Sequence, residues 1–299
     1  MRCWRIGKRA GPDRKVRTVN NPIPIAQLDK TFVEFHPDTW REVQNFATLI
    51  PGWVFRGQGC STWNLETSLE RCYKSVSPTN SISQCEKSIL DRFKRGAHHF
   101  ISCPPSHHNA LEWLAIIQHY GGPTRLLDFT RFFYVAVFFA MEAAKSDAAV
   151  WCLNTDLLRE TSKQLLSCIG EDFEPARVCD RIINDGIDIP ATINIEPYRL
   201  NERLIAQQGL FVMPCSLNSD VETCLFNTIN DEPVLVKRSE YDMAHLELGS
   251  FAAVGKVLKI LLPKAIHNDA RKTLRSMNID AASLFPGLDG FARSLRSYF

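Results

Sequence analysis

Residues 118–141 read QHYGGPTRLLDFTRFFYVAVFFAM, and this stretch joins a polar segment directly to a long apolar one. Two glycines and a proline at 121–123 end a preceding helix. A short segment at 124–128 then leads into a helix predicted over 132–144. The uninterrupted apolar run at 132–141 has ten residues, whereas a membrane span needs about 20. We therefore expect a buried core helix and no membrane segment.

Outside this stretch, apolar runs typical of strands and apolar stripes typical of helices follow one another in no regular order. Runs typical of short buried strands lie at residues 53–55, 148–153, 209–213 and 257–262. Stripes at helical spacing predict helices at 39–49, 265–277 and 288–298, and weaker patterns predict helical structure within 156–190 and 201–208. Because strands and helices do not alternate regularly, the α+β class is favoured over a doubly wound sheet. We expect a single domain with a small, mostly antiparallel sheet flanked by helices.

Three helix starts carry capping signals. Asp38 is the expected N-cap of the helix at 39–49. Residues 83–86 (Ser-Gln-Cys-Glu) match a capping box, and Asn109 with Glu112 is expected to cap the helix that precedes the Gly-Gly-Pro stop. These signals predict where each helix begins.

Composition and charge limit the class of protein. With 45% hydrophobic residues and a net charge of +2, the 299 residues can bury a full core but carry no global basic field for nucleic acid. Residues 1–30 are basic and lack periodicity, so we expect a flexible tail or, alternatively, an arm that contacts phosphates. We expect residues 31–299 to pack as one unit. The ten cysteines form no C-x-x-C pair and no apolar run follows the basic start, which favours a cytoplasmic protein with reduced thiols.

The first candidate site segment comprises Phe55, Arg56, Gly57 and Gln58. It places an arginine and a glycine at the end of an apolar strand. A guanidinium offers planar, bidentate donors to phosphate or carboxylate, and a glycine lets a ligand approach the backbone. The alternative is that Arg56 pairs with a structural carboxylate.

The second candidate segment, residues 118–130, places several polar side chains between two apolar helices, among them His119, Arg125, Asp128 and Thr130. Polar groups between core elements must be paired or functional. Arg125 and Asp128 alternatively form a buried ion pair, and His119 alternatively caps its own helix. Their coincidence beside Thr130 favours a site.

A third candidate segment precedes the strand at 209–213. It contains Glu202, Gln207 and Gln208. The two glutamines are placed either to reach a ligand or to satisfy backbone groups at a strand edge.

Standard catalytic motifs do not occur. Residues 57–59 (Gly-Gln-Gly) lack the third glycine of a dinucleotide fingerprint, and there is no P-loop, H-E-x-x-H or G-x-S-x-G. Five possible metal ligands fall close together, at His98, His99, Cys103, His107 and His108. Their spacing matches no standard zinc pattern, so we expect no metal.

Seven short motifs stand out along the chain: Phe55-Arg56-Gly57-Gln58, Glu112-Trp113-Leu114, Gln118-His119-Tyr120-Gly121, residues 123–130, Phe139-Ala140, residues 207–211 and residues 284–290. Together they resemble an FRG-domain protein, a family found mainly in bacteria and their mobile elements. The resemblance runs from about Phe32 to the C-terminus.

The order of these features also resembles an ADP-ribosyltransferase core, which implies that NAD is the substrate. In that case Arg56 would hold NAD, Thr130 would take the place of the Ser/Thr on the second strand, and Gln207 or Gln208 the place of the catalytic glutamate. Further binding residues would be Phe55, Gly57, Gln58 and Arg125.

Breaking the nicotinamide–ribose bond builds positive charge on the sugar, which a carboxylate stabilises. Because glutamine stands where that carboxylate is expected, Glu202 or Asp128 would have to supply it. His119 is a further catalytic candidate.

Three functions remain open. The first is an ADP-ribosyltransferase or NAD glycohydrolase in antiphage defence or as a toxin, with a protein or nucleic-acid acceptor. The second is a non-catalytic module that senses a nucleotide or a phage component. The third is a metal-dependent nucleic-acid enzyme that uses the cluster at 98–108.

Overall fold

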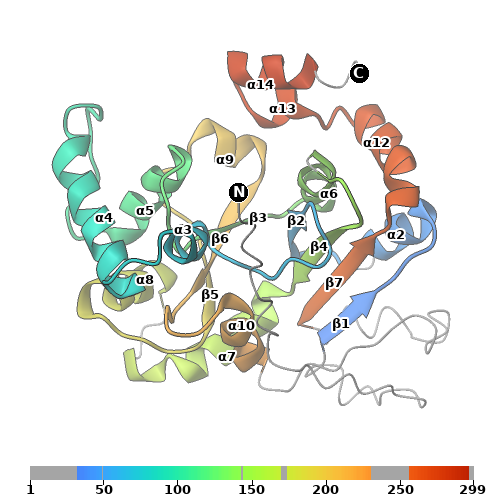
Figure 1. Cartoon of the computed structure of the whole chain (residues 1–299). Helices are drawn as coiled ribbons and strands as arrows, with labels where there is room; N and C mark the ends of the chain where they lie inside the picture. Colours follow the sequence, from blue (N-terminus) through green and yellow to red (C-terminus); the bar gives the residue numbers. More distant parts are fainter. Residues whose placement is uncertain (1–31, 49, 143, 170–173, 230–255, 296–299) are drawn as a thin grey trace, which may run out of the picture.

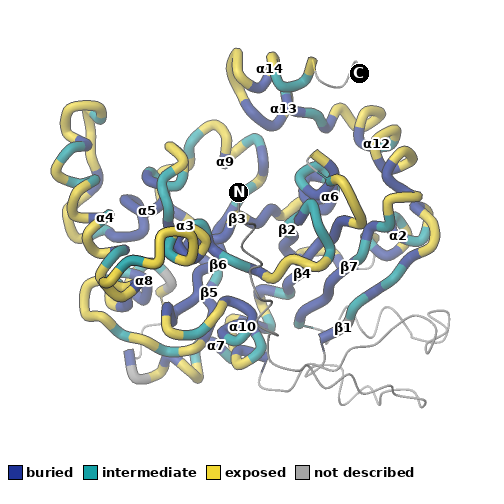
Figure 2. The backbone as a smooth tube through the Cα atoms, in the orientation of Figure 1, coloured by how far each residue is buried: buried dark blue, intermediate teal, exposed yellow. Residues whose placement is uncertain are grey.

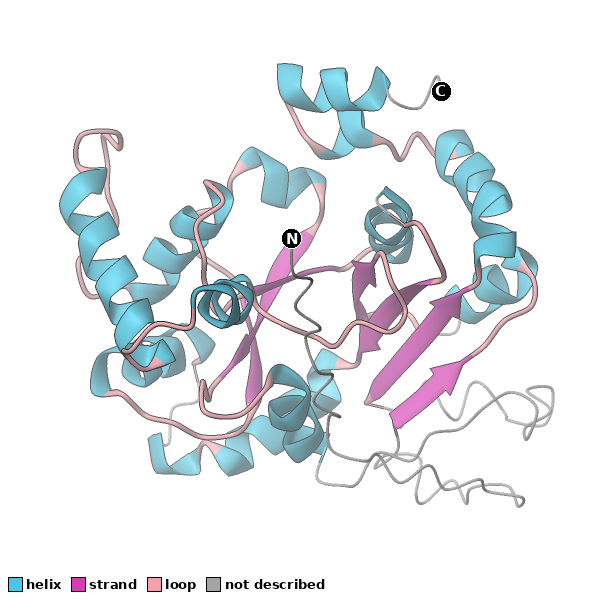
Figure 3. Cartoon of the chain, viewed as in Figure 1, coloured by secondary structure: helices cyan, strands magenta, loops and turns pink. Residues whose placement is uncertain are grey.

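The computed structural model describes residues 32–48, 50–142, 144–169, 174–229 and 256–295. The tail expected at 1–30 lies outside them. Within the described residues, seven strands form one sheet in the order β1-β7-β4-β2-β3-β6-β5 (Figure 1). Every neighbouring pair is antiparallel except β1 and β7. Helices flank this sheet on both sides (Figure 3), so the expected α+β class with a mostly antiparallel sheet is confirmed.

The strands are short: β1 Phe32–Phe35, β2 Val54–Gln58, β3 Leu127–Thr130, β4 Ala148–Leu153, β5 Thr192–Ile195, β6 Gly209–Pro214 and β7 Val257–Leu262. The strands predicted at 148–153 and 257–262 are confirmed with their bounds. The sequence does not predict β1 or β5, because four residues carry too little periodicity. The strand predicted at 53–55 was placed too early, since Arg56 and Gly57 lie inside β2 rather than after it.

The helices are α2 Trp40–Ala47, α3 Ser68–Val76, α4 Ile82–Ala97, α5 Ala110–His119, α6 Phe133–Glu142, α7 Thr155–Leu165, α8 Pro175–Asp185, α9 Glu202–Ala206, α10 Val221–Ile229, α12 His267–Ser276, α13 Ala281–Leu284 and α14 Leu288–Ser294. Neither α3 nor α10 is predicted from the sequence pattern. The core helix predicted at 132–144 corresponds to α6, most of whose side chains are buried. Among the described residues, no helix has the length and apolar character that crossing a membrane requires.

Two of the three capping predictions are corrected by one or two positions. The N-cap of α2 is Thr39 rather than Asp38, because the Thr39 side chain accepts from the backbone N–H of Glu42. The capping box of α4 pairs Ser81 with Gln84, two residues before the predicted one. Asn109 is the N-cap of α5, as predicted.

Three apolar clusters hold the sheet between the helices. One packs α2, α6 and α12 against β2, β4 and β7. A second packs α4, α5 and α8 against β5 and β6. The third joins α7 and α10 to residues of β2, β3, β4 and β6. Burial is therefore concentrated along the strands and α6, while α4 alternates between buried and exposed residues and α14 is mostly exposed (Figure 2).

The sheet is nearly divided between β2 and β3. β2 pairs with β4 from Val54 to Gln58, and β3 pairs with β6 along its whole length, but β2 and β3 share one pair, Phe55 with Thr130. A continuing antiparallel ladder would place Arg56 opposite Phe129. Because that pair does not form, the two strands diverge there. The sheet thus consists of two halves, β1-β7-β4-β2 and β3-β6-β5, which Figure 1 shows on either side of the molecule.

Candidate functional site

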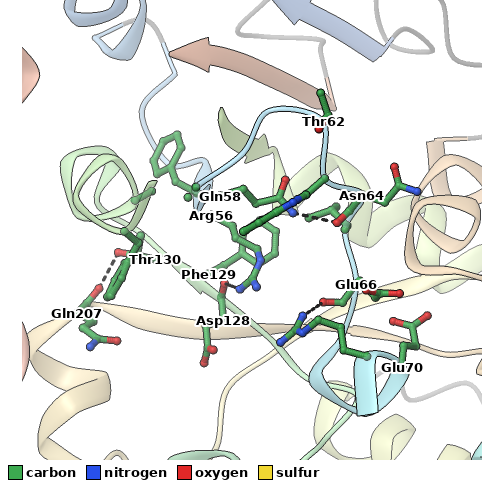
Figure 4. A pocket seen from close by; sticks show the side chains of 18 of the residues that line it. Arg56, Gln58, Thr62, Asn64, Glu66, Glu70, Asp128, Phe129, Thr130 and Gln207 are labelled. Carbon is green, nitrogen blue, oxygen red and sulfur yellow. Dashed lines mark hydrogen bonds between the residues drawn. The ribbon is translucent and has the colours of Figure 1, made fainter. Parts of the chain in front are cut away.

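A cleft of about 800 Å³ opens where β2 and β3 diverge. Its lining residues come from both strands, from the segment at 62–66, from α3, and from α6 and α9 (Figure 4). Residues of all three candidate segments meet here, although they are far apart in the sequence. The split in the sheet is therefore what creates the candidate site.

Arg56 lies at the base of this cleft. Its Nη1 donates to the main-chain oxygen of Asp128 over 2.8 Å, across the gap between the strands. Its Nε is buried and has no hydrogen-bond partner among the described residues. Burial lowers the pKa of Arg56; the Asp128 carboxylate acts against this shift, and the charge of Arg71 adds to it. The alternative, an ion pair between Arg56 and a structural carboxylate, is not found among the described residues, where the direct hydrogen bond goes to the main-chain carbonyl of Asp128.

Phe55 and Gly57 serve the packing of α6. The ring of Phe55 contacts Phe133 edge-on, with ring centroids 5.4 Å apart. A Cβ at position 57 would lie 2.0 Å from the carbonyl oxygen of Ala136, so only glycine permits α6 to approach β2. Close approach of a helix thus already requires this glycine, and the approach of a ligand to Gly57, which also lines the cleft, stays a prediction.

Gln58 holds the upper wall of the cleft. Its Oε1 accepts from Nε1 of Trp151 over 2.8 Å, and its Nε2 donates to the main-chain oxygen of Asn64 over 3.0 Å. Both ends of the amide are therefore occupied within the protein. Gln58 positions the segment at 62–66 along the cleft (Figure 4).

Asp128 and Thr130 line the cleft from β3. Thr130 Oγ1 donates to the main-chain oxygen of Gln207 over 2.6 Å and accepts from the N–H of Phe132. The Asp128 side chain is exposed, and its Oδ1 accepts from Nε2 of Gln118 over 2.9 Å. Thr130 therefore fixes α9 and the start of α6, while Asp128 keeps a carboxylate at the cleft wall.

The third candidate segment supplies no carboxylate to the cleft. The buried side chain of Gln207 donates from Nε2 to the main-chain oxygen of Leu284 over 3.0 Å. Gln208 is exposed and has a positive φ of 47°, which turns the chain from α9 into β6. Glu202 is exposed at the first position of α9 and is not among the residues that line the cleft.

Arg125 is buried away from the cleft. It forms an ion pair with Glu86 of α4, with its Nε 2.7 Å from Oε1. The alternative pairing with Asp128 is thus corrected to Glu86, a residue 39 positions earlier that no local pattern connects to it. Arg125 joins α4 to β3 and β6 and does not line the cleft.

His119 lies beside the cleft at the end of α5. It shares a small hollow with Gln118, Asp128 and Arg203. Partial burial lowers the pKa of His119, and the charge of Arg203 lowers it further. Because an unperturbed histidine titrates near pH 6.5, its imidazole is neutral at pH 7.

Helix α3 also contributes residues to the site, and none of the three candidate segments includes it. Glu70 is 7% exposed and forms the capping box of α3 with Thr67. Burial raises the pKa of Glu70, against the hydrogen bonds from Thr67. Arg71 donates from Nη1 to the main-chain oxygen of Glu66 over 2.6 Å. The Thr-x-x-Glu spacing at 67–70 is the signal that predicts this helix start.

The possible metal ligands at 98–108 belong to the hypothesis of a metal-dependent enzyme. Across the described residues, no group of three or more His, Cys, Asp or Glu side chains is close enough to hold a metal ion. The rings of His98 and His99 contact each other, as do those of His107 and His108. The third hypothesis therefore has no geometric support.

A family model described as the FRG domain matches residues 51–149. The chain is an FRG domain-containing protein. No curated protein and no solved structure matches it. The FRG domain match includes the cleft residues of β2, α3 and β3, whereas Arg203 of α9 and Gln207, which directly follows α9, lie outside the matched residues.

Three arginines line the cleft: Arg56, Arg71 and Arg203. Arg56 and Arg71 bond to main-chain oxygens, and Arg203 lies over the ring of Phe285. In contrast, carboxylate partners are present at Arg125, Arg131, Arg177, Arg181 and Arg293. The cleft thus holds three guanidinium groups whose direct contacts are with neutral groups.

Proposed function

We propose that the FRG cleft binds NAD or a related nucleotide and cleaves it as an ADP-ribosyltransferase or NAD glycohydrolase. The observation that carries the proposal is Arg56, whose buried Nε has no partner among the described residues at the point where the sheet divides. A buried donor without a partner is costly, and a phosphate oxygen would satisfy it.

The charges around Arg56 favour an anionic ligand. The positive charge of Arg71 lowers the pKa of Arg56, so the two guanidinium groups repel each other. An anion bound near both would relieve this repulsion. Arginine is also the side chain best suited to bidentate phosphate contacts.

The size and lining of the cleft suit a nucleotide. Ligand pockets usually have volumes of roughly 300–1,000 Å³, and this cleft has about 800 Å³. Trp63 lines it and is 58% exposed, and the half-buried Phe139 lines it from α6. Aromatic faces of this kind stack on nucleobases and pyridinium rings.

The cleft also contains the opposite charge that glycosidic cleavage needs. In this reaction the bond between ribose C1 and the nicotinamide nitrogen breaks, and its electron pair leaves with nicotinamide. Water or an acceptor hydroxyl then bonds to C1 and releases its proton to a base. Asp128 and Glu70 line the cleft together with Glu66 and Asp220, and Glu66 is paired with Lys74. We take Asp128 and Glu70 as the candidates to stabilise the sugar cation and accept this proton. His119, neutral and beside Asp128, is a further candidate to accept this proton.

A nucleotide-binding module without turnover is the second candidate. Gln207 stands where a transferase would present its glutamate, and its amide is engaged by Leu284. This observation favours binding over catalysis. Cytoplasmic location, a role in antiphage defence or as a toxin, and the protein or nucleic-acid acceptor remain predictions.

The first experiment measures thermal unfolding with and without millimolar NAD for wild type, Arg56→Ala and Arg92→Ala, an exposed arginine of α4 that does not line the cleft. A ligand at about 100 times its Kd adds about 2.7 kcal/mol, which raises the unfolding midpoint by several degrees. We expect this rise in wild type and Arg92→Ala but not in Arg56→Ala. Release of nicotinamide then separates the enzyme from the binding module, and no rise in wild type contradicts the proposal.

A further inference from the structure

Arg203 reaches the cleft from α9, on the half of the sheet opposite Arg56. Within the described residues, its guanidinium has no ion pair or hydrogen bond, and its contact is the ring of Phe285, with Cζ 4.7 Å from the ring centroid. A cation over an aromatic face is held in place while its N–H donors stay free. Arg203 is therefore oriented without being neutralised.

Phe285 is itself firmly positioned. Its side chain is 4% exposed, meets Phe139 of α6 edge-on at 6.0 Å and lies 3.8 Å from Cζ of Arg293. Arg293 is neutralised by Glu142, so of the two arginines on this ring, Arg203 carries the uncompensated charge. The ring thus connects the C-terminal helices to two walls of the cleft.

The main chain around Phe285 is fixed by two contacts. Gln207 donates to the main-chain oxygen of Leu284 over 3.0 Å, which ties α13 to the end of α9. A Cβ at Gly290 would lie 1.8 Å from the main-chain oxygen of Phe285, so α14 packs against this segment as closely as glycine allows. Figure 1 shows α13 and α14 above α9 and α6, over the region where the sheet divides. Residues 284–290, which lie outside the FRG match, thereby position the ring of Phe285 and with it the guanidinium of Arg203.

We infer that Arg203 is a second phosphate-binding residue and that Phe285 is its positioning residue. This inference rests on the proposed function and names the ligand class, a nucleotide with two linked phosphates. Arg56 and Arg203 approach from opposite halves of the divided sheet, so a diphosphate engages both, whereas a monophosphate engages one. A dinucleotide such as NAD and its product ADP-ribose carry this diphosphate.

The test measures Kd by calorimetry for ADP-ribose and for AMP, neither of which requires turnover. The proteins are wild type, Arg203→Ala, Arg203→Lys, Phe285→Leu and the double variant Arg203→Ala/Phe285→Leu. Phe291→Leu, at a 57% exposed aromatic of α14, and Arg92→Ala are the matched controls. Unfolding midpoints without ligand show whether each variant folds.

Arg203→Ala should weaken ADP-ribose binding roughly tenfold or more, the usual effect of one charge-assisted hydrogen bond. It should change AMP binding less than threefold, and Arg203→Lys should recover part of the loss. Phe285→Leu should weaken ADP-ribose binding several-fold, and the double variant should resemble Arg203→Ala, since Phe285 acts through Arg203. A merely structural role for Phe285 would lower both affinities equally and add to the effect of Arg203→Ala.

Two outcomes overturn the inference in distinguishable ways. If Arg203→Ala binds ADP-ribose as tightly as wild type while Arg56→Ala loses binding, Arg203 is not a phosphate-binding residue and the proposed function survives. If wild type binds neither ADP-ribose nor NAD, the proposed function and this inference fail together.

Discussion

The Nη1 atom of Arg56 donates a hydrogen bond to the main-chain oxygen of Asp128 over 2.8 Å, and this bond crosses the gap where β2 and β3 diverge. A ladder bond between two peptide groups is replaced there by a charged side chain. The same divergence that interrupts the sheet therefore brings a cation and a carboxylate together in one cleft.

Arg56 should cost the unliganded protein stability. Its burial lowers its pKa, and its Nε has no partner among the described residues, so Arg56→Met removes a poorly solvated charge while keeping the side-chain volume. We expect the free energy of unfolding without ligand to stay equal or to rise by up to about 1 kcal/mol. The rise of the unfolding midpoint that NAD causes in wild type should be lost. Calorimetry without NAD checks this; a large fall in the midpoint would show that Arg56 is chiefly structural.

Gly57 and Gly96 should respond oppositely to alanine. A Cβ at 57 would meet the Ala136 oxygen at 2.0 Å, whereas a Cβ at 96 in α4 meets nothing within 4 Å. We expect Gly57→Ala to destabilise by about 2 kcal/mol or more, and Gly96→Ala to stabilise by about 0.5–1 kcal/mol. Urea unfolding measures both. Equal small effects would mean that α6 can move away from β2 at little cost.

Arg125 should matter for stability and not for the ligand. Arg125→Met leaves Glu86 buried without its partner and should destabilise by about 3–5 kcal/mol, most of which Arg125→Met/Glu86→Leu recovers. Arg177→Ala at the exposed pair with Glu174 should cost at most about 1 kcal/mol. The unfolding midpoint of Arg125→Met/Glu86→Leu should still rise when NAD is added. If this double variant folds but its midpoint no longer rises with NAD, Arg125 takes part in ligand binding.

Glu70 should make stability depend on pH. Burial raises the pKa of Glu70 in the folded protein above its unfolded pKa, which is near 4.3. The stability that protonated Glu70 contributes is therefore fully present below the unfolded pKa and is lost as the pH rises through the folded pKa. Glu70→Gln still accepts from the N–H of Thr67, as Glu70 does. We expect its unfolding midpoint to match wild type near pH 4 and to exceed it at pH 7. The opposite order at pH 7 would indicate that ionised Glu70 stabilises the fold.

Local pattern predicts those elements whose own residues carry enough signal. The apolar runs that became β4 and β7 and the core helix that became α6 are recognisable because nearly every side chain is buried, whichever neighbour covers it. β1 and β5 are four residues long and depend on their partner strands. Their hydrogen bonds, rather than their composition, define them.

In the candidate site, too, some residues are recognisable from the sequence while their contacts are not. Arg56, Asp128 and Thr130 are recognisable as unusual polar residues beside apolar elements, and all three line the cleft. The pairing of Arg125 with Glu86 and the stacking of Arg203 on Phe285 join residues far apart in the chain. No local spacing encodes such contacts.

The sequence by itself determined the fold class, the buried core helix and the polar segments from which a site could be built, since hydrophobic periodicity and turn residues act over a few positions. The tertiary structure alone decided which polar residues meet. The split between β2 and β3 placed Arg56 in a cleft, and a carboxylate 39 positions away neutralised Arg125. Burial and charge pairing depend on neighbours that only packing brings together.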